Sequence, residues 1–284
     1  MRRRVERPLD VRPVLSYHVV MIESFIPLDI LENGGRELGI SLTQDQLAMF
    51  DKLARLLVET NSQMNLTRII APLDIVQLHF LDSLTCLAAH RPKKNHRTID
   101  VGTGAGFPGL AIKIAMPELP MTLVDATGKK IRFVEDTIKE LGIPEASTKC
   151  ARAEDLGRAK DFRGCFGTVY ARALAALPVV AELCIPLLRT GGTLVAQKAG
   201  DISEELRSAD QIITELGGQI VKVADAVIPG TDIRRKIILV RKVRPTPGTH
   251  FLFLGYGFND SHLEEYIKRK LITQACHGLI VTRD

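Results

Sequence analysis

The stretch TIDVGTGAGFPG (residues 98–109) decides how the rest of the chain is interpreted. An apolar run at 99–101 breaks into a loop that holds Gly102, Gly104, Gly106 and Gly109, and apolar residues of helical character resume after it. A strand, a glycine loop and a helix in this order bring backbone N–H groups up to a nucleotide-like ligand. Glycine suits the loop because the turn needs unusual backbone angles and because a Cβ would hold the ligand away.

Length and composition are those of an ordinary globular protein. The chain has 284 residues, 45% hydrophobic and 25% charged, which is enough for one good core and a smaller accessory region. No apolar run approaches the length of a membrane span. The five cysteines are scattered and form no C-x-x-C pair, which favours reduced thiols in a cytoplasmic protein with no metal site.

The net charge of +5 does not by itself indicate a nucleic-acid binder. Residues 1–20 hold five Arg and two acidic residues, and residues 244–284 hold five basic and four acidic residues. The body between them is therefore nearly neutral. Any contact with nucleic acid must come from a local patch.

Two helices are expected before the glycine loop. The range 42–62 has apolar residues on one face, and Thr43 and Gln46 can form a capping box at its start. The range 72–89 begins with a proline suited to the first turn of a helix. Residues 21–97 are therefore expected to form a helical cap.

From residue 98 onward the pattern alternates between strands and helices. Strands are predicted at 99–102, 121–125, 147–151, 168–171, 192–197, 219–224 and 236–243. Helices are predicted at 107–116, 128–141, 174–188 and 201–216. Such alternation is typical of an α/β protein with a parallel sheet and helices on both faces. The last two strands are joined by a Pro-Gly loop without a helix, so they should pair antiparallel as a hairpin.

The glycine loop alone fits two cofactors. It contains G-x-G-x-x-G, and Asp125 ends the next predicted strand, where a carboxylate can accept hydrogen bonds from ribose hydroxyls. NAD and S-adenosylmethionine share that ribose, so the loop and the acid do not separate them. Ala153 and Glu154 follow the third strand, where adenine would meet an acceptor. Together with the terminal hairpin they favour the Rossmann-like class I methyltransferase fold.

Several strings occur in an order that points to one family. They are NLT (65–67), HFLDS (79–83), DVGTGAGFPG (100–109), LVDATGKKIRF (123–133), AE (153–154), RA (172–173), GG (191–192), AQK (196–198) and Arg235. Over residues 21–243 they resemble the bacterial 16S rRNA guanine-N7 methyltransferases, also called glucose-inhibited division protein B.

The resemblance implies a cytoplasmic enzyme, expected to be a monomer, that uses S-adenosylmethionine. It implies methylation of N7 of a guanine in the decoding-region loop of 16S rRNA, as naked RNA or in the small ribosomal subunit. Loss of activity in this family is associated with low-level streptomycin resistance. The cofactor-binding residues carried over are Gly102, Phe107, Ala153, Glu154 and Arg172, to which the loop motif and the fold add Gly104 and Asp125.

Guanine N7 carries a lone pair, so methyl transfer needs positioning more than a general base, and no residue is singled out as certainly catalytic. The candidates are Asn65, His79, Asp82 and Arg172. His79 and Asp82 share a helix face, either as a buried hydrogen-bonded pair that orients the cap or with His79 in a guanine pocket. Asn65 is either a turn residue or a polar contact to the cofactor or base. Arg172 lies in an apolar run and needs a carboxylate or phosphate partner.

The candidates for RNA contacts are Lys129, Arg152, Lys198 and Arg235. Lys129, Lys198 and Arg235 match positions in the family strings, and Arg152 follows a predicted strand. The competing interpretation is that these are ordinary solvated surface cations.

The chain departs from the family at both ends. Residues 1–20 are expected to be a disordered extension, because polar residues interrupt their apolar part and no signal cleavage site follows. After the methyltransferase domain at 98–243, the tail 244–284 begins with family-like prolines and continues with an unrelated aromatic run at 251–258. Either a shifted reading frame or a natural extension would produce such a tail.

Three alternative functions remain open at this point. The same fold can methylate another substrate. An NAD-dependent oxidoreductase would need a hydride-handling site, which the sequence does not reveal. A non-catalytic RNA-binding protein would hold RNA without transferring a methyl group.

Overall fold

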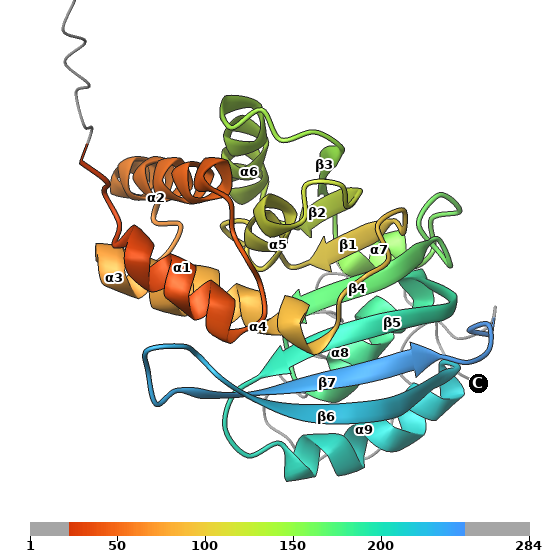
Figure 1. Ribbon diagram of the computed structural model, residues 1–284. Helices are drawn as coiled ribbons and strands as arrows, with labels where there is room; N and C mark the ends of the chain where they lie inside the picture. Colours follow the sequence, from red (N-terminus) through yellow and green to blue (C-terminus); the bar gives the residue numbers. More distant parts are fainter. Residues whose placement is uncertain (1–22, 248–284) are drawn as a thin grey trace, which may run out of the picture.

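The computed structural model describes residues 23–247, so the predictions for residues 1–20 and 251–284 lie outside the described part. Its strands are β1 Thr98–Val101, β2 Met121–Asp125, β3 Ala146–Cys150, β4 Phe166–Arg172, β5 Leu188–Lys198, β6 Gly218–Val227 and β7 Arg234–Lys242. They form one seven-stranded sheet in the order β3-β2-β1-β4-β5-β7-β6 (Figure 1).

The direction of the strands confirms the expected fold class. β1 to β5 run parallel to one another, whereas β7 is antiparallel to both β5 and β6. The last two strands therefore form the terminal antiparallel hairpin that distinguishes the class I methyltransferase sheet. Because β1, β2, β4 and β5 are parallel, their carboxyl ends meet at one edge, where ligands of such sheets bind.

Helices cover both faces of the sheet. They are α5 Gly109–Ala115, α6 Gly128–Glu140, α7 Ala153–Leu156, α8 Leu177–Cys184 and α9 Ser203–Glu215, with a 3-10 turn η2 at Ile185–Leu187. Successive residues of a strand face opposite sides, and β7 shows this clearly. Its Ile237 belongs to one hydrophobic cluster and its Ile238 to the other, so the sheet separates two cores.

The N-terminal helices pack onto the first of these cores. They are α1 Leu28–Glu37, α2 Gln44–Met64, α3 Pro72–Asp74, the π-helix η1 Ile75–Leu81 and α4 Asp82–Ala89. Figure 1 shows them on the side toward which the arrowheads of β1, β4 and β5 point. Their buried apolar side chains share one cluster with those of α5 and β2. The helices therefore lie beside the carboxyl edge of the sheet and share its core.

Several elements differ from the sequence prediction, and one of them is the short helix α7, where no helix was predicted. The helix α1 was not predicted, because it contains two glycines; a Cβ at Gly34 would lie only 2.6 Å from the Leu81 side chain, so the glycine permits close packing. The single helix expected at 72–89 contains the π-helical segment η1. The helix expected at 174–188 ends at Cys184, and β5 begins at Leu188, because Pro186 cannot continue an α-helix.

The capping box at the start of α2 is confirmed and gives a first stability prediction. Thr43 Oγ1 accepts from Gln46 N at 3.3 Å, and Gln46 Oε1 accepts from Thr43 N at 2.8 Å. Thr43→Ala is expected to lower the free energy of unfolding by about 1 kcal/mol, because one helix N–H loses its acceptor. Urea denaturation measures this loss. Glu59→Ala, on an exposed position of the same helix, is the control and should change stability by less than about 0.5 kcal/mol.

Candidate active site

The loop between β1 and α5 has the backbone that only glycine adopts readily. Gly102, Gly104 and Gly106 have φ angles of +73°, +60° and +94°. A Cβ would lie 2.5 Å from Leu174 at Gly102 and 2.3 Å from Leu110 at Gly106. At Gly104, in contrast, a Cβ would meet no atom within 4 Å. The backbone at Gly104 therefore faces open space, and a ligand can approach it closely.

Asp125 faces this loop from the carboxyl end of β2. Its Oδ2 accepts from Gly104 N at 3.0 Å, and its Oδ1 accepts from Thr127 N at 2.8 Å. The residue is 9% exposed. An ionised carboxylate has about four acceptor positions, so Asp125 retains capacity for the hydroxyls of a ribose. The geometry fits the adenosine part of a cofactor at this place.

Asp100 stabilises the glycine loop by accepting hydrogen bonds from two of its residues, and it was not predicted as a site residue. Its Oδ2 accepts from Thr103 Oγ1 at 2.6 Å and from Gly109 N at 2.8 Å. Burial raises the pKa of its carboxyl group to about 6. The only available signal was an acidic residue inside an otherwise apolar strand.

Ala153 and Glu154, the residues predicted to lie at the adenine, follow β3. Cys150 of β3 lies beside Asp125 in the parallel register, so the residues after Cys150 continue at the same sheet edge. Ala153 and Glu154 form the first turn of α7 there, and both are half-buried. The structure therefore places them at the same sheet edge as Asp125.

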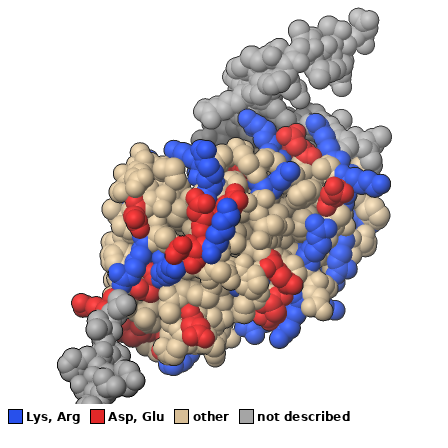
Figure 2. All heavy atoms as spheres, turned by 90° about the horizontal axis from the view of Figure 1, so that it is seen from above, with Lys and Arg blue, Asp and Glu red and all other residues tan. Residues whose placement is uncertain are grey.

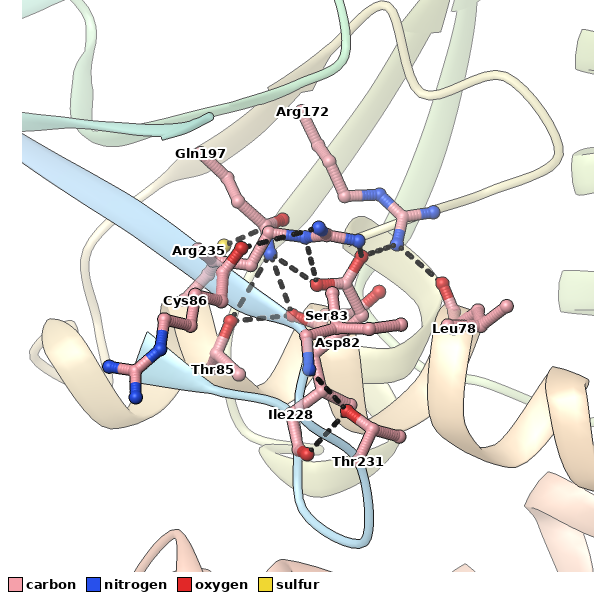
Figure 3. Close-up of polar contacts among 12 residues, drawn as sticks. Leu78, Asp82, Ser83, Thr85, Cys86, Arg172, Gln197, Ile228, Thr231 and Arg235 are labelled. Atoms are coloured by element: carbon pink, nitrogen blue, oxygen red, sulfur yellow. Dashed lines mark hydrogen bonds and ion pairs between the residues drawn. The ribbon is translucent and has the colours of Figure 1, made fainter. Parts of the chain in front are cut away.

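Four side chains at the same edge form what we call the Asp82 cluster: Asp82, Arg172, Gln197 and Arg235 (Figure 3). Asp82 Oδ2 accepts from Arg172 NH1 at 3.1 Å, and Asp82 Oδ1 accepts from Arg235 Nε at 2.9 Å. Gln197 Nε2 donates to Asp82 Oδ1 at 2.7 Å. One buried carboxylate thus joins α4 to β4, β5 and β7, and Arg172 has the carboxylate partner that its apolar run required.

His79 and Asp82 do not form the expected pair with each other. His79 is buried, and its ring stacks on Phe107 with centroids 4.4 Å apart. Its Nδ1 lies 3.4 Å from Arg172 NH2 and its Nε2 lies 3.1 Å from Thr67 Oγ1. The expectation of a hydrogen bond between His79 and Asp82 is wrong, because the side chain of each is bonded to residues of other elements.

These contacts fix the state of the His79 ring. Arginine can only donate, so Nδ1 is the acceptor and Nε2 carries the proton that is donated to Thr67. Burial, with a further contribution from the Arg172 charge, lowers the pKa of His79 from 6.5 to about 3. His79 is therefore neutral at neutral pH, which favours a shaping role over proton transfer.

The neutral state of His79 gives a pH prediction. Because its pKa is lowered in the folded state, protons bind the unfolded chain first, and stability falls as the pH drops below about 6.5. His79 contributes up to about 1.4 kcal/mol per pH unit to this fall. Urea denaturation between about pH 7 and about pH 5 should show a smaller slope for His79→Gln. An imidazole NMR resonance of His79 that titrates near pH 6.5 would contradict the assignment.

The remaining candidates lie in different surroundings. Asn65 is exposed and ends α2 with a φ of 44°, which agrees with a turn residue. Lys198 is mostly buried, and its Nζ lies 2.6 Å from Glu205 Oε2. Lys129 and Arg152 are exposed, Lys129 with its Nζ donating to Met64 O at 3.2 Å. On the face seen in Figure 2, acidic and basic side chains are interspersed.

Residues 23–247, the described part of the chain, show neither a metal-binding cluster nor a membrane-spanning helix. They contain no group of three or more His, Cys, Asp or Glu side chains arranged to hold a metal ion. Within the same part of the chain, every helix is too short or too polar to cross a membrane.

Comparison with known proteins identifies the family of the chain. The family model for rRNA small subunit methyltransferase G matches residues 46–234. The ribosomal RNA small subunit methyltransferase G of Alkaliphilus oremlandii is 39% identical over 222 residues, covering 78% of this chain and 93% of that protein. The Deinococcus radiodurans protein of the same name is 41% identical over 222 residues, covering 78% and 87%. The chain therefore belongs to the rRNA small subunit methyltransferase G family.

Proposed function

We propose that the chain transfers a methyl group from S-adenosylmethionine to N7 of a guanine in the decoding-region loop of 16S rRNA. The observation that carries this proposal is the meeting of two features at one sheet edge. The glycine loop with Asp125 offers a place for an adenosine-containing cofactor. The Asp82 cluster lies beside it, linked through Arg172, whose guanidinium carbon is 5.6 Å from the Phe107 ring centroid in the loop.

The cofactor contacts that we propose follow from this arrangement. Backbone groups of Gly102, Gly104 and Phe107 would contact it in the loop, because the Phe107 ring itself is buried against His79. Asp125 would accept from the ribose, and Ala153 and Glu154 would lie at the adenine. Arg172 would lie between the cofactor and the base, because it contacts both Phe107 and Asp82.

Methyl transfer to guanine N7 requires little acid–base catalysis from these residues. When bound, S-adenosylmethionine supplies a methyl group that its sulfonium already activates. Guanine N7 attacks with its own lone pair, so the protein needs to hold the base in line with that methyl group. The neutral His79 ring and the fixed Arg172 side chain suit this positioning role.

The charges at this edge support RNA as the substrate. The Asp82 cluster combines one carboxylate with two guanidinium groups, so it keeps a positive charge. Lys129 and Arg152 are exposed and available for phosphates, which position RNA without reading its sequence. Lys198 is paired with Glu205, so we assign it a smaller direct role.

We further propose that residues 21–97 cap the site, that 98–243 form the methyltransferase domain and that the protein acts as a monomer in the cytoplasm. The shared core supports the cap, because the N-terminal helices and the sheet bury one apolar cluster together.

One experiment tests the function directly. The protein is incubated with labelled S-adenosylmethionine and with 16S rRNA or small ribosomal subunits that lack the methyl group, and the modified base is mapped. We expect one methyl group on N7 of a guanine in the decoding-region loop. RNA binding without transfer would instead indicate a binding protein, and transfer elsewhere would indicate another substrate. Calorimetry with NAD tests the oxidoreductase alternative.

A further inference from the structure

A basic cavity lies at the edge of the sheet opposite to the one that holds the Asp82 cluster. It has a volume of about 280 Å³ and is lined by the segment before β1, the starts of β4 and β5 and the end of β7. Thr168, the lining residue of β4 nearest to Arg172, lies four residues before it, which corresponds to about 13 Å at 3.3 Å per residue. The cavity is therefore distinct from the site of methyl transfer.

The charges of this cavity are of one sign. Its lining includes Arg91, Lys93, Arg189 and Arg241, together with the imidazoles of His90 and His96. Among the described residues, no Asp or Glu belongs to the lining. Like charges that converge without a counter-charge repel each other, and an anion between them relieves that repulsion.

The two arginines at its mouth have neutral partners. Arg189 NH2 lies 2.9 Å from His96 Nε2, and Arg241 NH1 donates to Thr193 Oγ1 at 3.3 Å. Burial and the nearby Arg189 charge lower the pKa of His96, and burial and Arg241 do the same for His90. The guanidinium groups thus keep donors for a ligand, and the geometry of such donors matches the oxygens of a phosphate.

The backbone around the cavity contains two glycines and one irregularity in strand pairing. A Cβ on Gly167 would lie 2.8 Å from the His96 side chain, so glycine is needed where that ring packs against β4. The pairing of β4 with β5 is irregular between Phe166 and Thr168. Gly191, at the other wall, has a φ of +80°. Two glycines and a strand irregularity therefore lie at the walls of this cavity.

We propose that this cavity is an anion site, which holds a phosphate of the substrate RNA and anchors the RNA at a distance from the reacting guanine. Its volume lies near the lower limit for small-molecule sites, and its lining offers no Phe, Tyr or Trp ring on which a base could stack. A phosphate group fits this chemistry better than a whole nucleotide does. The identity of the polymer rests on the proposed function, whereas the anion site itself does not.

The test compares two double variants. Arg189→Ala/Arg241→Ala removes two cations from the cavity, and the control Lys139→Ala/Arg207→Ala removes two exposed cations that pair with glutamates on their own helices. Binding of a fluorescent 16S rRNA fragment is measured from about 50 to about 200 mM salt. We expect the cavity variant to bind RNA at least about 10-fold more weakly and to lose about 1 to 2 units of the salt slope. Affinity for S-adenosylmethionine should stay unchanged. RNA affinity and salt slope equal to those of the control would overturn the RNA assignment.

A second experiment tests anion binding in the cavity independently of RNA binding. Titration of the wild-type protein with inorganic phosphate should shift the imidazole NMR resonances of His90 and His96, and the cavity variant should lose this response. Absence of the shift overturns the anion site. A shift together with unchanged RNA binding in the variant assigns the cavity to a free phosphorylated ligand and overturns the RNA assignment. Methyl transfer by the wild-type protein is measured in parallel, so failure of the proposed function is seen separately.

Discussion

Replacement of Asp82 by alanine is expected to destabilise the protein by about 3–5 kcal/mol and to abolish methyl transfer. The Asp82 side chain is 6% exposed, and it is the carboxylate partner of Arg172 and Arg235, which are 15% and 20% exposed. Removal of one carboxylate leaves two largely buried guanidinium groups uncompensated. Gln197 Nε2 loses its shortest acceptor, Asp82 Oδ1, and keeps Asp82 O and Thr85 Oγ1. Urea denaturation and the methyl-transfer assay measure the two effects.

Two further variants show whether charge or packing is responsible. Asp82→Asn keeps the shape of the side chain but removes its charge, so we expect a loss nearly as large as that of Asp82→Ala. Glu204→Ala removes the carboxylate from an exposed ion pair with Arg207 and should cost less than about 1 kcal/mol. An Asp82→Ala protein as stable as Glu204→Ala and still active would contradict the role of the Asp82 cluster.

The order of strands and helices could be predicted because it depends on local patterns. Apolar runs bounded by turns predicted the strands, and the missing helix between 219–224 and 236–243 predicted the antiparallel hairpin. The structure confirms the hairpin in the register of β6 with β7. The helix α1 was missed because Gly34 and Gly35 lower helix propensity, whereas packing against Leu81 favours glycine at position 34.

The loop residues of the site were also accessible from the sequence, because a glycine loop and the acid after the next strand lie on consecutive elements. The contacts within the Asp82 cluster could not be predicted from the sequence. Asp82 is separated from Arg172 by 90 residues and from Arg235 by 153 residues, and no local pattern encodes such contacts. Helical spacing placed His79 and Asp82 on one face, but partners from distant strands decided their bonds. Gln197 carried only the weak signal of a polar residue in an apolar strand.

Gly104→Ala is expected to reduce methyl transfer on the order of 100-fold while the protein remains folded. A Cβ at position 104 meets no protein atom within 4 Å, so it would project into the space that we assign to the cofactor. It would hold the cofactor away from the backbone and out of line with the guanine. The φ of +60° adds a strain of about 1 kcal/mol. Calorimetry with S-adenosylmethionine and the transfer assay measure the result.

Gly39 provides the matched control for this change. It has a φ of +72°, and a Cβ there also meets no atom within 4 Å, but it follows α1 and not the cofactor loop. Gly39→Ala should therefore lose the same stability as Gly104→Ala and keep wild-type affinity for S-adenosylmethionine. Because backbone strain is equal in the two variants, a difference in cofactor binding reports only on the space in front of Gly104. Equal binding by both variants would place the cofactor elsewhere.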